Sequence, residues 1–287
     1  MMKNIIGIII ISVILKNVRK GLIYMNESDS KKLIEQLNNI LSNISESVEK
    51  EEILKKANDI AEELINITKY TYDEMCNTYS DLRESEPNER DKKMWEILSE
   101  FVKKELEKNI SDTKLLDVGT GSGRDIRYAT KLGYKTIGVD NSDGFIERLK
   151  KLEDNGLIPK NSYKKCDMRK LSFDDETFDV VRHNASLLHL PLIGKKYMAD
   201  LAISEAFRVL KSDGLIYIYV KEGDKLDFVN TNEGLGGRIF QFYNYYMLSS
   251  LLQRNGFKII FNKELTEERA GNIIKWIAVI AKKQKNS

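Results

Sequence analysis

The sequence of 287 residues predicts an α/β protein with a doubly wound, seven-stranded, mostly parallel sheet whose last strand is antiparallel, preceded by a helical extension. Two observations support this fold class. Short apolar runs alternate with segments whose apolar residues recur at helical spacing, as in repeated βαβ units. One of these runs, in LLDVGTGSGRD at 115–125, ends in three closely spaced glycines. Such a glycine turn is typical of the first strand in a ligand-binding parallel sheet.

The apolar and β-branched runs predict seven strands. The first five begin near Lys114, Lys135, Tyr163, Phe178 and Leu215, and the last two, an antiparallel pair, cover 257–261 and 273–281. Helical spacing predicts helices that include 145–152, 197–210 and 245–255. The segment 221–238 is expected to be a loop over the active site.

Residues 1–24 form an apolar and basic leader. Its apolar core, Ile5 to Leu15, has 11 residues, whereas a membrane span needs about 20. No small-residue cleavage site follows, as a signal peptide would require. We therefore expect translation to begin at Met25, with a short membrane-associating anchor as the alternative.

The remaining chain divides into a helical extension, 25–69, and a main domain, 70–287, that begins with a helical lid at 70–110. Two amphipathic stretches in the extension can form a helical hairpin packed on the core. Alternatively, residues 31–69 can contact a second copy of the chain or a protein partner. Tyr72, on the lid, faces either a ligand or the core.

Charge and cysteine content narrow the partners and the compartment. The net charge is +2, but from Met25 onward 42 basic residues stand against 44 acidic ones. A nucleic-acid partner is disfavoured, because it usually requires a clustered basic surface. The two cysteines make no disulfide framework, which indicates a reducing, cytoplasmic compartment. Two histidines and two separated cysteines predict no metal site.

The spacing of the glycines bears on the cofactor. Gly119, Gly121 and Gly123 lie at alternate positions, whereas a dinucleotide site has its third glycine one residue later, where this chain has Arg124. The carboxylate of Asp117 would repel a pyrophosphate but suits a cationic amino-acid group. The turn therefore favours S-adenosylmethionine over NAD.

Four further segments follow in order: GVDNSD at 138–143, KCDMRKLSF at 165–173, FDVVRHNASLLHLP at 178–191 and AFRVLKSDGLIYIYVKEG at 206–223. With them, residues 70–282 resemble the class I S-adenosylmethionine-dependent methyltransferases, of the small-molecule type 11 or 25 group. The resemblance implies a Rossmann-like fold and S-adenosylmethionine as cofactor.

The resemblance also implies cofactor-binding residues. Asp140, at the end of the second strand, accepts the ribose hydroxyls, Asp167 accepts the adenine amino group, and Met168 lies against the adenine ring. The alternatives are a helix cap for Asp140, and a turn aspartate and a core methionine for the other two. The complete candidate set is Asp117, Gly119, Thr120, Gly121, Gly123, Asp140, Asn141, Asp167, Met168 and Asn184.

The sequence does not identify the methyl acceptor, but it offers candidate residues for binding it. His189 can act as a base or make a structural hydrogen bond, and His183 is a weaker candidate base. Arg238 can hold a carboxylate or phosphate, and Tyr243 or Phe240 can shape the cavity. The alternative for this aromatic segment is a patch that anchors a surface loop.

These observations predict an S-adenosylmethionine-dependent methyltransferase that transfers a methyl group to N or O of a small molecule by direct displacement. Because the cofactor carries the activated carbon, the protein needs mainly to align the two reactants, exclude water from them and remove one proton from the acceptor. The alternatives are a methyltransferase-like binding or scaffold protein with little activity, and an RNA methyltransferase, which the charge disfavours.

Overall fold

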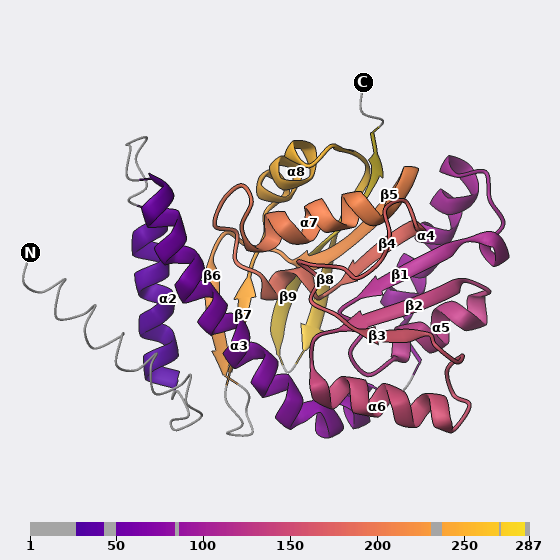
Figure 1. Cartoon of the computed structure of the whole chain (residues 1–287), viewed down its shortest axis with the longest axis horizontal. Coiled ribbons are helices and arrows are strands. Elements are labelled where there is room, and N and C mark those ends of the chain that lie inside the picture. The colour runs from indigo at the N-terminus through magenta and orange to yellow at the C-terminus, as the bar shows by residue number, and fades with distance from the viewer. Residues whose placement is uncertain (1–26, 43–49, 84–85, 231–236, 270, 285–287) are drawn as a thin grey trace, which may run out of the picture.

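A computed structural model describes residues 27–42, 50–83, 86–230, 237–269 and 271–284 (Figure 1). The leader at 1–24 and the start at Met25 lie outside the described residues. Within the described part of the chain, no helix is both long enough and apolar enough to cross a membrane.

The main sheet has seven strands in the order β3-β2-β1-β4-β5-β9-β8. Neighbouring strands from β3 to β5 are parallel, and β9 is antiparallel to both β5 and β8. The predicted fold is therefore confirmed, including the antiparallel last strand. The bounds are β1 Lys114–Val118, β2 Lys135–Asp140, β3 Tyr163–Lys165, β4 Phe178–Asn184, β5 Leu210–Lys221, β8 Phe257–Arg269 and β9 Asn272–Lys283.

Helices flank this sheet. Every residue of β4 from 178 to 183 is buried, as expected for a central strand covered on both faces. Helices α5 and α6 pack beside β2 and β3, whereas α7 and α8 pack beside β5 and β8 (Figure 1). The bounds are α4 Glu89–Glu105, α5 Arg124–Leu132, α6 Asp143–Asp154, α7 Met198–Val209 and α8 Tyr245–Arg254, with short 3-10 turns η1 Ile110–Asp112 and η2 Leu187–His189.

Two helices precede the sheet. Helix α2, Glu27–Ser42, lies beside α3, Lys50–Arg83, and α3 also packs against α6 (Figure 1). Helix α3 has 34 residues and runs without a break through residue 70, where the sequence suggested the start of the main domain. One continuous helix therefore links the proposed extension to the proposed lid.

The expected loop at 221–238 is wrong in part, because the structure has a hairpin there. Strand β6, Leu226–Asn230, pairs antiparallel with β7, Gly237–Gln241, as a separate two-stranded sheet. Helix α3 completes the hydrogen bonding of β7: Thr68 Oγ1 accepts from the Ile239 N–H at 3.1 Å, and Thr71 Oγ1 donates to the Gly237 carbonyl at 2.8 Å. The hairpin therefore depends on a helix more than 160 residues earlier in the chain.

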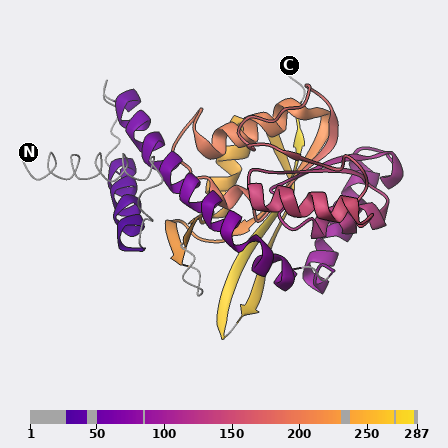
Figure 2. The ribbon, with the colours of Figure 1, turned by 60° about the horizontal axis from the view of Figure 1, so that its bottom comes forward.

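The last two strands are also longer than predicted. The sequence indicated 257–261 and 273–281, but pairing between β8 and β9 continues to the end of both strands. Figure 2 shows the two strands extending together beyond the rest of the sheet. The outer part of β8 carries charged residues as far as Arg269, so a search for apolar runs does not recognise it as a strand.

Candidate active site

A cavity of 580 Å³ lies at the carboxyl ends of the parallel strands. The turn after β1, the end of β2 and the loop after β3 form one side of its wall, and α3, η2 and β7 form another. This is the edge at which doubly wound sheets bind their ligands. The cavity is large enough for a cofactor together with a small second molecule.

The glycine turn after β1 is held against β2. The N–H groups of Gly119 and Thr120 both donate to the Val139 carbonyl, at 2.8 and 3.0 Å. Gly119 has φ +74°, and a Cβ there would lie 2.3 Å from the Cβ of Ser186. A side chain at this position is therefore excluded both by backbone conformation and by space.

Asp140 faces the cavity at the end of β2. Its Oδ2 accepts from the Gly121 N–H at 2.8 Å and its Oδ1 from the Ser142 N–H at 2.9 Å. Helix α6 is capped instead by Ser142, whose Oγ accepts from the Phe145 N–H. Burial raises the pKa of Asp140 to about 6, although these N–H groups act to lower it. Ser142, and not Asp140, is therefore the N-cap of α6. The Asp140 carboxylate is held beside the glycine turn.

The loop after β3 carries Asp167 and Met168, which both line the cavity. Arg169 donates to both oxygens of Asp167, from Nε at 3.1 Å and Nη2 at 2.7 Å. Burial alone would raise the pKa of Asp167, but the hydrogen bonds from Arg169 hold it below its ordinary value. The Asp167 carboxylate is therefore ionised at neutral pH and fixed in direction.

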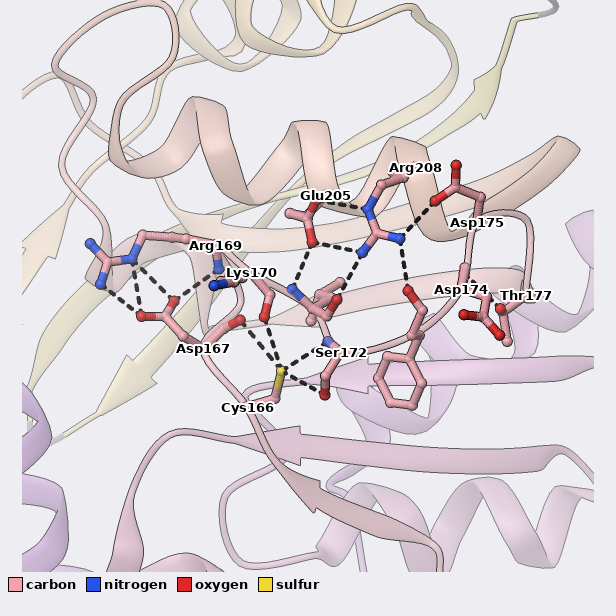
Figure 3. A network of polar contacts seen from close by, with 12 residues as sticks. Cys166, Asp167, Arg169, Lys170, Ser172, Asp174, Asp175, Thr177, Glu205 and Arg208 are labelled. Atoms are coloured by element: carbon pink, nitrogen blue, oxygen red, sulfur yellow. Dashed lines mark hydrogen bonds and ion pairs between the residues drawn. The ribbon is translucent and has the colours of Figure 1, made fainter.

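Figure 3 shows how the rest of this loop is fixed to α7. Arg208 donates to the carbonyls of Leu171 and Phe173, at 2.8 and 2.7 Å, while Glu205 accepts from the Leu171 N–H at 2.7 Å. The thiol of Cys166, at the start of the loop, contacts Ser172. The backbone that places Asp167 and Met168 is thus held by hydrogen bonds to α7 and within the loop.

A buried ionic cluster lies beneath the turn. Arg182 Nη1 donates to Asp117 Oδ1 at 2.8 Å and lies 3.3 Å from Asp125 Oδ2. Arg124 pairs with Asp125 at 3.0 Å, and Asn184 Nδ2 donates to Asp125 at 3.3 Å. Burial alone would raise the pKa of Asp125, but Arg182 and Arg124 hold it below its ordinary value. Asp117 forms an ion pair with Arg182 and is not among the residues that line the cavity.

The sequence interpretation missed Arg182, Arg124 and Asp125. Arg182 lies in a strand that was taken as apolar, and it is 2 % exposed. A charged side chain inside a buried strand requires a buried partner of opposite charge. An arginine in an otherwise apolar strand was therefore the signal from which a buried acidic partner could have been predicted.

On the acceptor side, Tyr72, His189 and Arg238 are joined by hydrogen bonds. His189 Nδ1 lies 2.8 Å from the Ile239 carbonyl, so Nδ1 carries the proton and donates. Nε2 then accepts from the Tyr72 hydroxyl at 2.8 Å, and Arg238 Nη1 donates to the same hydroxyl oxygen at 3.1 Å. Burial lowers the pKa of His189 to about 3. The imidazole is neutral, and both of its nitrogens are engaged.

Two other acceptor-side candidates lie away from the cavity wall. Tyr243 is fully buried, and its hydroxyl donates to the Leu190 carbonyl at 3.3 Å. His183 is also fully buried, and burial lowers its pKa to about 3. Neither is among the residues that line the cavity, whereas Tyr72, His189 and Arg238 are.

Comparison with known proteins identifies the central part of the chain. Residues 116–218, from β1 into β5, match the family model described as a methyltransferase domain. This segment is a class I S-adenosylmethionine-dependent methyltransferase domain of the type 11 group.

The methyltransferase domain is similar to that of other proteins in sequence and in structure. A sterol 24-C-methyltransferase of Candida albicans is 30 % identical over 164 residues, covering 54 % of this chain and 42 % of that protein. The crystal structure of an S-adenosylmethionine-dependent methyltransferase from Methanosarcina mazei has 25 % identity and a TM-score of 0.52, covering 61 % of this chain and 94 % of that one. The chain thus spans about two fifths of the length of the curated relatives it matches.

A third similarity concerns the fold alone. The structure of 1,6-didemethyltoxoflavin-N1-methyltransferase from Burkholderia thailandensis, with 1,6-didemethyltoxoflavin and S-adenosylhomocysteine bound, has 19 % identity and a TM-score of 0.59. It covers 78 % of this chain and 90 % of that chain. The arrangement of the methyltransferase domain therefore extends beyond 116–218.

Most predicted cofactor positions meet at the cavity of the methyltransferase domain. The cavity-lining ones are Gly119, Thr120, Gly121, Asp140, Asn141, Asp167, Met168 and Asn184. Asp117 and Gly123 lie behind them: Asp117 binds Arg182, and Gly123 caps α5. The individual roles of all these residues stay predictions.

Proposed function

We propose that the protein transfers the methyl group of S-adenosylmethionine to an N or O atom of a small molecule. The observation that carries this proposal is the position of Asp140, held by the Gly121 and Ser142 N–H groups beside the glycine turn. Asp167 and Met168, which we propose to contact the adenine, line the same cavity and support this proposal.

The residues present suit each part of the cofactor. Asp140 can accept from two ribose hydroxyls, and the Asp167 carboxylate can accept from the adenine amino group. Arg124 and Asp125, both at the cavity wall, offer opposite charges for the carboxylate and ammonium of the methionine part. The absence of a side chain at Gly119 and Gly121 leaves the turn open for close approach.

The cofactor supplies an activated methyl carbon. With S-adenosylmethionine bound, direct displacement by a lone pair of the acceptor would give the methylated acceptor and a neutral thioether, S-adenosylhomocysteine. Helix α3 and strand β7 form part of the cavity wall and are joined to each other by the Thr68 and Thr71 hydrogen bonds. Their role is to exclude water and align the acceptor with the methyl group.

The acceptor must also give up a proton. His189 Nε2 accepts from Tyr72, and because burial lowers the pKa of His189 to about 3, this imidazole orients the Tyr72 hydroxyl and is too weak a base to keep a proton at neutral pH. We expect Tyr72→Phe to lower kcat by about 10- to 100-fold, because the acceptor loses its alignment, while affinity for S-adenosylhomocysteine is unchanged. Steady-state kinetics with calorimetry checks both. An unchanged kcat would remove this hydroxyl from the alignment of the acceptor.

Two measurements on the full chain test the proposal. Calorimetry with S-adenosylhomocysteine measures the cofactor site, and transfer of label from methyl-labelled S-adenosylmethionine into a cell extract measures activity. Saturable binding with label in small molecules supports the proposal. Binding without transfer supports a scaffold, whereas binding of a nicotinamide nucleotide in place of S-adenosylhomocysteine excludes the cofactor assignment.

A further inference from the structure

The acceptor side of the cavity carries positive charge. Arg238, from β7, and Lys221, from the end of β5, both line the cavity and lie against the ring of Phe240. The Lys221 Nζ is 3.9 Å from the centroid of that ring, and the Arg238 guanidinium carbon is 5.5 Å from it. An aromatic ring thus holds two cations at one wall of the site.

Arg238 is held in place but is not neutralised. Its Nη1 donates to the Tyr72 hydroxyl, and its guanidinium carbon lies 5.2 Å from the Tyr72 ring and 5.5 Å from the Phe240 ring. Among the described residues, Arg238 makes no ion pair with a carboxylate, and its buried Nε has no hydrogen-bond acceptor. A buried donor without an acceptor is unfavourable, and the guanidinium as a whole lines the cavity with its positive charge unpaired by a carboxylate among the described residues.

Acidic residues of the cavity wall have partners other than Arg238, among them Asp91, which pairs with Arg90 and Arg124. Asp125 binds Arg124, Asp167 binds Arg169, and Glu267 binds Arg90 at 3.0 Å. Asp140 accepts two backbone N–H groups. Each of these carboxylates therefore has a partner other than Arg238.

From this arrangement we infer that the methyl acceptor is a compact anion whose carboxylate or phosphate group is bound by Arg238, with Lys221 beside it. The inference rests on the proposed function and names the substrate class of the same site. The anionic group is the handle that orients the acceptor, and a separate N or O atom receives the methyl group. Arginine suits this task because its planar fork pairs with two oxygens of one group.

Size and charge both limit the acceptor. The cavity of 580 Å³ must also contain the cofactor, so the room left for the acceptor is small. Next to two cations, an acceptor that is anionic, or that loses its proton as it attacks, is favoured over one that is left with positive charge.

The first test uses the native protein. A deproteinised small-molecule extract is separated by anion exchange at pH 8 before reaction, and each fraction is offered with methyl-labelled S-adenosylmethionine. Label in the retained, anionic fraction is the expected result. Label only in the unretained fraction overturns the inference and leaves the proposed methyl transfer intact, whereas no label in any fraction overturns both. Treating the active fraction with phosphatase then distinguishes a phosphate handle, which is lost, from a carboxylate, which is kept.

The second test identifies Arg238 as the handle's partner. With the active fraction, Arg238→Gln is expected to raise the acceptor KM about 10- to 100-fold, as for loss of a charged hydrogen bond, while S-adenosylhomocysteine affinity stays unchanged. Arg238→Lys restores part of the loss. Lys225→Gln is the control, because Lys225 is an exposed cation at the start of the same hairpin. An unchanged KM in Arg238→Gln overturns the inference. If that variant loses cofactor binding, the fractionation result decides.

Discussion

The two halves of the cavity are built in different ways. On the cofactor half, Gly119, Asp140 and Asp167 each lie directly at or after the end of a strand, in a loop of a few residues. On the acceptor half, Tyr72 meets His189 and Arg238 across sequence separations of 117 and 166 residues. Local sequence therefore marks the residues of the first half that line the cavity, whereas those of the second half come together only in the tertiary structure.

The two halves also differ in what they demand of the fold. The cofactor half contains a buried ionic cluster and a glycine with a positive φ angle, and neither can change without strain. The acceptor half consists of side chains on a helix and a hairpin that pack onto the sheet. We expect substitutions in the cofactor half to reduce stability and cofactor affinity, and those in the acceptor half to leave cofactor affinity intact.

The largest effect is expected at Arg182. Arg182→Met removes the partner of Asp117, which is 2 % exposed, and leaves a buried carboxylate without a counterion. Breaking a buried pair in this way costs about 3–5 kcal/mol of unfolding free energy. Urea denaturation measures the loss. The double variant Arg182→Met with Asp117→Asn is expected to recover part of it, and a single variant as stable as the native chain would contradict this account.

Gly119→Ala is expected to have the next largest effect. The substitution combines an unfavourable φ of +74° with a Cβ placed 2.3 Å from the Ser186 Cβ, for a loss of about 2–4 kcal/mol and of cofactor binding. Gly156→Ala is the matched control, because Gly156 has φ +68° but no atom within 4 Å of an added Cβ. A control loss as large as that of Gly119→Ala would show that backbone conformation alone matters.

The pH dependence of binding should follow Asp140. Because burial raises its pKa to about 6, the carboxylate is ionised above that pH and protonated below it. Affinity for S-adenosylhomocysteine should therefore be constant above pH 7 and fall by up to about tenfold per pH unit below pH 6. Calorimetry across this range measures it.

A variant shows whether Asp140 causes that dependence. Asp140→Asn is expected to bind about 10- to 100-fold more weakly and to lose the acidic fall. Asp154→Asn, an exposed position at the end of α6, should keep the native profile. A native profile in Asp140→Asn would assign the titration to another group.

How far the sequence predicts the molecule follows the same division. The seven strands, the glycine turn and the approach of Asp140 to that turn were predictable, because each depends on a short stretch of chain with a recognisable pattern. Arg182 was not recognised, since its partners Asp117 and Asp125 come from other elements. The hairpin of β6 and β7 was missed for the same reason: α3 supplies part of its hydrogen bonding. The sequence analysis divided the chain at residue 70, between the extension and the lid. In the structure α3 continues across this position, so the two regions share one helix.

The smallest effect is expected at Thr71, where α3 meets the hairpin. Thr71→Val keeps the shape of the side chain but removes its hydrogen bond to the Gly237 carbonyl, which should lower the free energy of unfolding by about 1 kcal/mol. Thr78→Val, at an exposed position on the same helix, is the control. Because Thr71 positions the strand that carries Arg238, the variant should raise the acceptor KM without changing affinity for S-adenosylhomocysteine. Equal losses of both affinities would mean that the two halves are mechanically one unit, and the comparison would no longer hold.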